Sequence, residues 1–504
     1  MALYGLSPSG TAQGGGGIDA EWVDSVKEQW LREAHLKGGT IKVTTDFEIL
    51  SREGKEMRTL SSRLKHIESI GDAGGGGSAG DGDGGGLSQS DYVRRVRELN
   101  EEIATSWIEN NRVGSLKLAI RVASLLADTS VPMFYSTLFV LVSELMDTMG
   151  QLVWERIRHK HEHDESGRKV HKLDKVFTCH DVRQEARDVC GNWFYKIGTV
   201  TALVPRLYME AAIIRCSHYL HEGPPVESMR RLASMVRGIG DPLAMAYAAC
   251  FIARRACQLI PTTFAAASAD GAGGTKYVLP DILFHLFMDV MPAYSRLARL
   301  DATGEKNLLR GLTLKQYCEM FTPALKWLAH CLVACGNETG SSLGLALITG
   351  EIGANESTDG MPAQCAVTGV FLAAMLEELP DSLVAAKASA TVKAIANASF
   401  AEFGNADGAR RAACLRELAG KSLRYPPDTV KKRRVLLVGA WRLLRSFSEI
   451  DDFMCAAEVW VEYALRHMEV NELDACFGDI AMRFEAASNE NSANAYQFYR
   501  YDDG

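Results

Sequence analysis

The sequence predicts an all-α fold. Apolar residues recur with a helical period of about 3.6 along most of the chain after Leu87, whereas the alternating pattern of a strand hardly appears. Successive helix pairs are spaced by roughly 35 to 50 residues, as in irregular helical repeats. A chain of 504 residues also exceeds what a single hydrophobic core organises. We therefore expect a HEAT-like α-solenoid of helical hairpins, preceded by a flexible glycine-rich tail.

The tail is expected to span residues 1–86. It contains 19 of the 45 glycines, in tracts that cannot bury enough surface to offset the entropy lost on ordering. Two less biased segments, Ile18–Leu36 and Ile41–Ile70, lie between the tracts, and the first carries Trp22 and Trp30. Apolar anchors in a flexible arm indicate either short docking segments or incidental composition.

The solenoid is expected to span residues 87–485, and a polar end residues 486–504. Its first helix carries Tyr92, Val96, Leu99, Trp107 and Ile108 on one face, after a capping-box pattern at Ser88 and Asp91. Asp181 with Gln184 resembles a second capping box. Other helices are expected to begin near Pro132, Pro205, Pro225, Asp241, Val278, Leu312, Met361, Asp381, Asp407, Pro427 and Ser448. Three long loops are expected, at His159–Lys175, Ala265–Gly274 and Gly336–Gly360.

Charge and composition exclude several classes of protein. The net charge of −8 provides no cationic field for a nucleic-acid backbone, so we expect no nucleic-acid partner. The one basic cluster, Lys431–Arg434, is interpreted as the solvated first turn of a helix; an import signal and a lipid-facing patch are the alternatives. The 12 cysteines form no Cys-x-x-Cys pair, which favours reduced, buried thiols. No run approaches 18 apolar residues, so any membrane association should be peripheral.

Motifs for metal or nucleotide chemistry are weak. His159, His161, His163, His171, Cys179 and His180 are the only metal-like cluster, but charged residues interleave the histidines, as in a solvated loop. The Gly238-Ile239-Gly240 segment has Leu243 where a dinucleotide fingerprint needs its third glycine, and Gly420-Lys421-Ser422 has Leu415 where a phosphate loop needs its first. We therefore expect no catalytic residue, no metal and no cofactor.

Two motifs on successive hairpins are the candidate functional residues. In Pro205-Arg206-Leu207-Tyr208, the proline opens a helix, and arginine and tyrosine are enriched at interface hot spots, although both also pack between helices. The stretch Arg237–Leu243 has the features of an interhelix joint: Gly238 or Gly240 could adopt the left-handed conformation, Asp241 could cap the next helix, and Pro242 suits its first turn. Arg237 either complements the helix dipole or contacts a partner or another helix.

These residues resemble a known family. The Pro205–Tyr208 element, the stretch Cys190–Ile197 and the Gly240-Asp241-Pro242-Leu243 ending resemble the large α-solenoid subunit of the endosomal Retriever complex, the vacuolar protein sorting 35-like family. Leu87–Val93, Leu125–Val131 and Cys455–Tyr463 resemble it too. The resemblance extends from about Leu87 to Arg483 and is weakest in Cys331–Lys421.

The resemblance implies a non-catalytic scaffold that supports endosome-to-plasma-membrane transport. Its implied partners are an arrestin-fold sorting subunit, a phosphoesterase-fold sorting subunit, COMM-domain and coiled-coil proteins, a sorting-nexin cargo adaptor and, peripherally, the cytosolic face of the endosomal membrane. Pro205, Arg206, Leu207, Tyr208, Arg237 and Asp241 are the predicted partner-binding residues, at the end that receives the arrestin-fold subunit. Family members continue for many helices after the Trp460 block, so we expect the cradle for the phosphoesterase-fold subunit to be missing, as in an incomplete or diverged short form.

Two alternatives follow from the same sequence. Within the scaffold class, the chain could be a retromer-type large subunit that acts in endosome-to-Golgi retrieval, because both large subunits share the Pro-Arg-Leu-Tyr signature. Outside that class, the histidine cluster and the glycine motifs leave a metal-dependent or nucleotide-using helical enzyme as a remote alternative.

Overall fold

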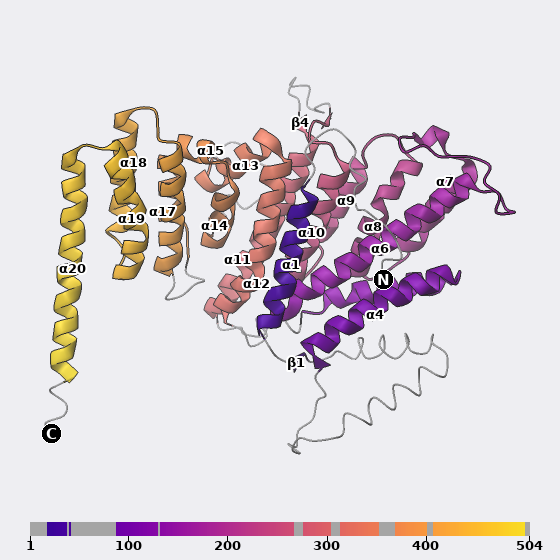
Figure 1. Ribbon diagram of the computed structural model, residues 1–504, viewed down its shortest axis with the longest axis horizontal. Helices are drawn as coiled ribbons and strands as arrows, with labels where there is room; N and C mark the ends of the chain where they lie inside the picture. Colours follow the sequence, from indigo (N-terminus) through magenta and orange to yellow (C-terminus); the bar gives the residue numbers. More distant parts are fainter. Residues whose placement is uncertain are drawn as a thin grey trace, which may run out of the picture. The chain divides into compact units, whose positions relative to one another are not determined.

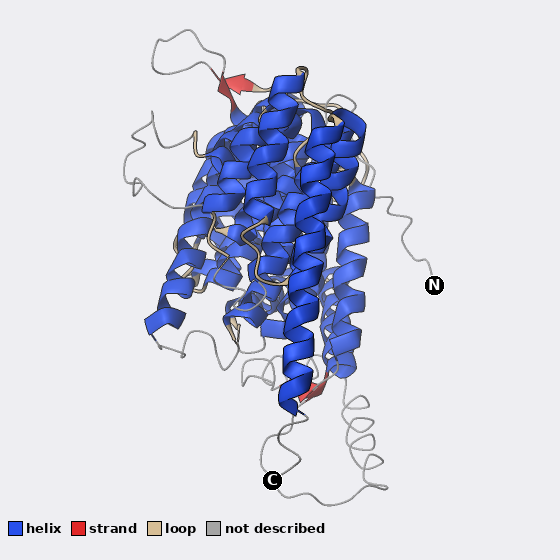
Figure 2. Cartoon of the chain, turned by 90° about the vertical axis from the view of Figure 1, so that its left-hand side faces the viewer, coloured by secondary structure: helices blue, strands red, loops and turns tan. Residues whose placement is uncertain are grey.

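The computed structural model describes residues 18–37, 40–41, 87–129, 132–266, 276–303, 313–351, 368–400 and 407–498. Most of them are helical, and the strands among them are two antiparallel pairs of two residues each, β1 (Thr40–Ile41) with β2 (Leu87–Ser88) and β3 (Ala265–Ala266) with β4 (Lys276–Tyr277) (Figure 2). The fold is therefore the predicted all-α solenoid. The chain forms two compact units, residues 1–286 and residues 287–504.

The first unit contains the following helices, where η marks a 3-10 turn: α1 (Ala20–Lys37), α4 (Gln89–Ile108), α5 (Arg112–Ser124), η1 (Leu125–Ala127), η2 (Pro132–Phe134), α6 (Tyr135–Glu162), η3 (Cys179–Asp181), α7 (Gln184–Gly198), α8 (Leu203–Ile213), η4 (Ile214–Tyr219), α9 (Val226–Val236) and α10 (Pro242–Leu259). Helix α11 (Val278–Thr303) begins in this unit and ends in the next. The starts that the sequence predicted lie within a few residues of the observed ones, because proline and capping residues mark them, whereas no start was predicted for α1 or α5.

The second unit continues with α12 (Leu314–His330), the π-helical turn η6 (Cys331–Cys335), α13 (Asn337–Thr349), α14 (Gly369–Glu378), α15 (Asp381–Ala386), α16 (Ala388–Asn397), α17 (Asp407–Arg424), α18 (Val430–Leu444), α19 (Ile450–His467) and α20 (Val470–Phe498). Helices α17 to α20 stand side by side (Figure 1), with α19 packed against α17, α18 and α20. Helix α20 runs past residue 485, where the solenoid was expected to end.

Helix α13 corrects the prediction of a long loop at Gly336–Gly360. Glycines normally indicate a loop, but here Gly340 and Gly344 lie inside a helix. A Cβ at Gly344 would lie 2.7 Å from the Met375 sulfur, and one at Gly340 would collide with the Leu332 carbonyl oxygen. The glycines therefore permit close packing of α13 on η6 and α14, which sequence periodicity cannot reveal.

Three further details differ from the sequence-based expectations. Ile108, assigned to the buried face of the first helix, is 70% exposed because it lies at the last residue of α4, beyond the packed turns. Asp181 does not open α7: its carboxylate accepts hydrogen bonds from the Thr178 amide (2.7 Å) and hydroxyl (2.9 Å) and so closes a capping box around η3 instead. The loop expected at His159–Lys175 begins later, because α6 continues to Glu162.

Helix α1 comes from the predicted tail and packs on α6. Trp30 is only 4% exposed, and its ring lies 5.6 Å from that of Tyr247 and 6.1 Å from that of Phe139, measured between ring centroids. The Trp30 carbonyl accepts a hydrogen bond from the Thr137 hydroxyl at 3.3 Å. The first of the two segments suspected of docking thus folds back onto this same chain. Apart from Ile41 in β1, the second segment and most of the tail, including its glycine tracts, lie outside the described residues.

The core of the first unit surrounds α10. Every residue from Pro242 to Ala253 is buried, so this helix is enclosed on all sides rather than along one stripe. Helices α6, α8 and α9 pack around it. At the crossing of α6 and α8, Gly150 faces the Ala212 backbone so closely that a Cβ would overlap the Ala212 carbonyl oxygen.

We predict that Gly150→Ala lowers the free energy of unfolding by about 1–3 kcal/mol, because the added methyl would push α6 away from α8. The matched control is Gly191→Ala on α7, where no atom lies within 4 Å of the new Cβ. That substitution should be neutral or stabilise by up to about 1 kcal/mol, since alanine favours a helix over glycine. Urea unfolding measures both, and equal effects would contradict the close approach.

Candidate partner-binding site

The Pro205–Tyr208 motif forms the start of α8. Pro205 lies in the first helical turn, where its missing N–H would have no helical partner. Leu207 and Tyr208 are fully buried, and the Tyr208 ring lies 5.0 Å from that of Phe251. Burial raises the pKa of the Tyr208 phenol well above its usual range. Within the chain, three of the four motif residues therefore pack the helices, and Arg206 alone keeps a substantial exposed surface.

Arg206 is held by a buried carboxylate. Its Nε donates to the Glu210 carboxylate one turn later at 2.8 Å, and the Arg231 guanidinium of α9 binds the other oxygen of the same group. The Glu210 side chain is 6% exposed, whereas those of Arg206 and Arg231 are 37% and 49% exposed. The buried Glu210 carboxylate thus fixes two partly exposed guanidiniums at the surface. We call Arg206, Glu210 and Arg231 the α8 arginine pair site.

Sequence reasoning identified Arg206 but missed Glu210 and Arg231. The spacing of Arg206 and Glu210, four residues apart on one helix, was a signal that could have indicated their ion pair. Nothing in the sequence relates Arg231 to them, because α9 follows only after η4 and a loop.

The predicted joint between α9 and α10 is present with one correction. The Asp241 carboxylate caps α10 by accepting the amides of Leu243 (2.9 Å) and Ala244 (3.1 Å), and Pro242 occupies the first turn as expected. It also accepts a hydrogen bond from the Thr129 hydroxyl at 2.6 Å, which ties the joint to the segment that follows η1. Asp241 is thus a structural cap. Its predicted role in partner binding remains a prediction.

The correction concerns the two glycines of this joint. Neither Gly238 nor Gly240 has a positive φ. The glycines in the left-handed conformation in the described ranges are Gly167, Gly223 and Gly350. Gly238 is required for a different reason, because a Cβ there would lie 2.8 Å from the Leu203 Cδ2 atom. Arg237 is exposed at the C-terminal cap of α9, a position compatible with either role that the sequence left open.

An ion cluster joins α1, α6 and α10. The Asp147 carboxylate accepts two hydrogen bonds from Arg254, both at 2.8 Å, and one from Arg255 at 2.6 Å, and Lys27 of α1 approaches to 3.8 Å. Burial by itself would raise the pKa of Asp147, but the surrounding cations outweigh it and hold this pKa at about 2. Burial lowers the pKa of Arg255 to about 10.

The metal-like histidines do not converge. His159 and His163 stack on each other, with ring centroids 4.1 Å apart, while buried His161 accepts the Arg183 amide at 3.2 Å. Burial and the neighbouring His171 lower the pKa of His161. Among the residues that the structure describes, one group has metal-ligand geometry, and it combines Cys179 and His180 with a residue that the sequence did not suggest, Glu222.

The Cys179, His180 and Glu222 group consists of an exposed ion pair beside a buried thiol. The His180 and Glu222 side chains are 76% and 64% exposed and already contact each other at 3.2 Å. The Arg187 guanidinium binds the Cys179 carbonyl oxygen, which adds a positive charge next to the group. Ten cysteines are described, all as free thiols, and nine of them are buried.

The Gly420-Lys421-Ser422 motif has a structural role. Lys421, in the rejected phosphate-loop match, is 3% exposed inside α17, and its ammonium donates to the Leu379 carbonyl at 2.9 Å and to the Asp381 carboxylate at 3.1 Å. It therefore satisfies the C-terminal end of α14 rather than a phosphate.

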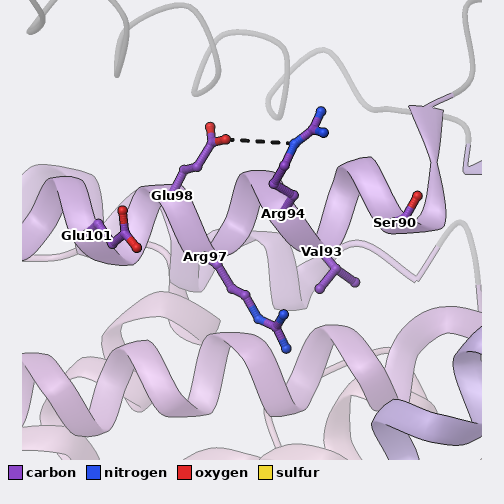
Figure 3. Close-up of a pocket in the computed structure, with 6 residues that line it drawn as sticks. All are labelled: Ser90, Val93, Arg94, Arg97, Glu98 and Glu101. Atoms are coloured by element: carbon purple, nitrogen blue, oxygen red, sulfur yellow. Dashed lines mark ion pairs between the residues drawn. The ribbon is translucent and has the colours of Figure 1, made fainter. Parts of the chain in front are cut away.

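A surface hollow on α4 is lined by residues of this one helix, namely Ser90, Val93, Arg94, Arg97, Glu98 and Glu101 (Figure 3). Arg94 lies 3.8 Å from Glu98 and 2.7 Å from Asp91. Two of the lining side chains, Arg94 and Glu98, therefore pair with each other along the helix.

The architecture defines the class of protein as an α-solenoid built from helical hairpins. Comparisons with known proteins identify its family. The family model described as VPS35L matches residues 24–269, and the model described as the VPS35L C-terminal domain matches residues 356–497. The chain belongs to the VPS35L family, which confirms the resemblance seen in the sequence. The first match begins inside the predicted tail and includes most of α1.

Relatives from distant organisms agree. The chain is 29% identical over 397 residues to the VPS35 endosomal protein-sorting factor-like protein of Danio rerio, 28% identical over 398 residues to that of Homo sapiens, and 26% identical over 397 residues to that of Dictyostelium discoideum. Each alignment covers 78% of this chain and 36% of the relative, so the chain spans little more than a third of their length. A solved circular tandem repeat protein aligns over 79% of both chains with 12% identity, and its TM-score of 0.21 is too low to bear on the fold.

We predict that Asp147→Asn lowers the free energy of unfolding by about 3 kcal/mol at neutral pH, because it leaves two buried guanidiniums without their carboxylate. A carboxylate with a depressed pKa stabilises the fold above its unfolded pKa of about 3.9 and loses this contribution as the pH falls towards its folded pKa. With a folded pKa of about 2, the difference between wild type and variant should shrink between about pH 4 and pH 2.

Urea unfolding across this pH range measures the effect. The control is Asp174→Asn at an exposed loop position, which should change stability by less than about 0.5 kcal/mol. A difference between wild type and Asp147→Asn that stays constant down to about pH 2 would show that the ion cluster does not hold the carboxylate charged.

Proposed function

We propose that this chain is a non-catalytic scaffold subunit of an endosomal cargo-recycling complex of the Retriever type. Membership of the VPS35L family and the names of its relatives, which are endosomal protein-sorting factor-like proteins, support this proposal. None of the described helices combines the length and the apolarity that crossing a bilayer requires. The proposal therefore places the chain peripherally, in the cytoplasm and on the cytosolic face of endosomes.

A scaffold role also agrees with where the perturbed ionisable groups lie. Strong pKa shifts occur in the Asp147 cluster and at buried residues such as Cys190, whose pKa burial raises to about 12. These groups lie between packed helices, whereas a catalytic acid, base or nucleophile needs access to a substrate. Their chemistry is that of helix packing.

The proposed binding partner is an arrestin-fold sorting subunit, and the α8 arginine pair site is the observation that carries this proposal. Arginine is enriched at interface hot spots because its planar group makes several directed hydrogen bonds. Arg206 and Arg231 are held in place by Glu210 before any partner arrives, so little side-chain entropy remains to be lost on binding. Pro205, Leu207 and Tyr208 would then contribute by fixing α8, not by contact.

We predict that Arg206→Ala weakens binding of the arrestin-fold subunit from the same organism at least about tenfold, while helical content and the thermal midpoint stay nearly unchanged. The fold should tolerate the change because Arg231 continues to neutralise Glu210. Titration calorimetry with the full chain, together with circular dichroism, measures both quantities.

Arg158→Ala is a closely matched control. Arg158 is also 37% exposed and also donates through Nε to a carboxylate four residues later, that of Glu162 at 3.1 Å. It should leave binding unchanged. If the wild-type chain does not bind the arrestin-fold subunit, the proposed partner is wrong; if Arg206→Ala loses fold and binding together, Arg206 is a packing residue.

A further inference from the structure

The exposed face of α18 is both cationic and apolar. The helix contains five lysine or arginine residues and no aspartate or glutamate. Its buried side consists of Leu436, Leu437, Ala440, Trp441 and Leu444. The opposite side therefore carries Lys431, Val435, Val438 and Arg442, which follow at intervals of four, three and four residues and so share one helical face. The sequence indicated a solvated basic turn but not the valines beside it.

The two valines on this face are each about half exposed to solvent. Val435 is 56% exposed and Val438 is 51% exposed, although both lie in the middle of a helix whose other side is packed. Lys431, Lys432 and Arg442 surround them and are exposed as well. Single exposed valines are ordinary, but two adjacent ones ringed by cations form a small amphipathic surface.

The cations of α18 divide into two groups. Arg434 pairs with Glu472 of α20 at 2.6 Å, and Arg433 donates to the Pro427 carbonyl at 2.6 Å, so both serve the fold. Across the described part of the chain, in contrast, no ion pair is formed by Lys431, Lys432 or Arg442. Two exposed carboxylates lie near the start of the helix: Asp428 just precedes it, and Glu469 approaches Arg434 to 3.8 Å.

We infer that this face, the α18 patch (Lys431, Lys432, Val435, Val438 and Arg442), docks on an anionic lipid surface. Each basic residue near such a surface contributes attraction that acts within about one Debye length. The short valines suit shallow insertion between headgroups, with the helix lying parallel to the membrane. The net charge of −8 gives the chain no general attraction to anionic membranes, so binding must be local.

A protein partner fits the α18 patch less well. Protein hot spots centre on large aromatic or arginine anchors that fill a pocket, whereas the patch presents two small aliphatic groups on a convex helix. The membrane contact deepens the proposed scaffold function, which requires work at a membrane, but it can succeed or fail separately because its test contains lipid and no protein partner.

The test is co-sedimentation of the full chain with phosphatidylcholine vesicles, with and without phosphatidylserine, and in a third arm with a phosphoinositide. Wild type should bind the anionic vesicles and not the neutral ones, and binding should fall as salt is raised. The triple variant Lys431→Ser, Lys432→Ser, Arg442→Ser should bind at least about tenfold more weakly. Val435→Ser with Val438→Ser should also weaken binding while leaving the charge unchanged.

The matched control removes three exposed lysines elsewhere, by Lys172→Ser, Lys175→Ser and Lys196→Ser, and should bind like wild type. Circular dichroism checks that every variant is folded. Failure of the wild type to bind anionic vesicles, or equal binding by the triple variant, would overturn the inference. Binding of wild type to polyglutamate but not to vesicles would also overturn it, and would identify the patch as a site for an acidic protein segment.

Discussion

The packing of the first unit depends on one carboxylate, which neutralises two arginines of a buried helix. Helix α10 is enclosed on all sides, yet it carries Arg254 and Arg255 near its C-terminal end. A guanidinium that loses its water without gaining an anion is strongly unfavourable, so α6 must present Asp147 to both. This requirement fixes the positions of α6 and α10 along each other. Lys27 extends the same cluster to α1, so the N-terminal helix is placed by charge as well as by Trp30.

The same arrangement, one carboxylate that binds two arginines, explains why the candidate site resembles a packing cluster. Glu210, like Asp147, binds two guanidiniums, but here both arginines reach the surface. The difference between a packing cluster and a docking site is thus exposure and not residue type. In a solenoid, each hairpin buries its apolar face against its neighbours and leaves its outer face available for binding. The proposed scaffold needs no cleft, because recognition can be distributed over helix surfaces such as those proposed for α8 and α18.

Sequence periodicity predicted most helices because amphipathic burial and capping are local properties. Asp241 and Pro242 show this well, since a cap and a first-turn proline act within four residues of each other. The errors arose at residues whose role depends on contacts between different helices. Gly340 and Gly344 indicated a loop, but the structure uses them for close helix contacts. Arg231, which completes the candidate site, lies on α9 and not on α8 with Arg206 and Glu210, so only part of this site could be predicted.

The amino-acid sequence by itself determined the helical class, the position of most helix starts and, through its motifs, the family. These follow from patterns confined to one helix or joint, where chemistry and spacing are visible along the chain. Tertiary structure decided which residues of each motif are buried, where α1 docks, and which cations remain unpaired. Those outcomes depend on contacts between residues as far apart as Thr137 and Trp30, and burial is set by neighbours that no linear pattern names.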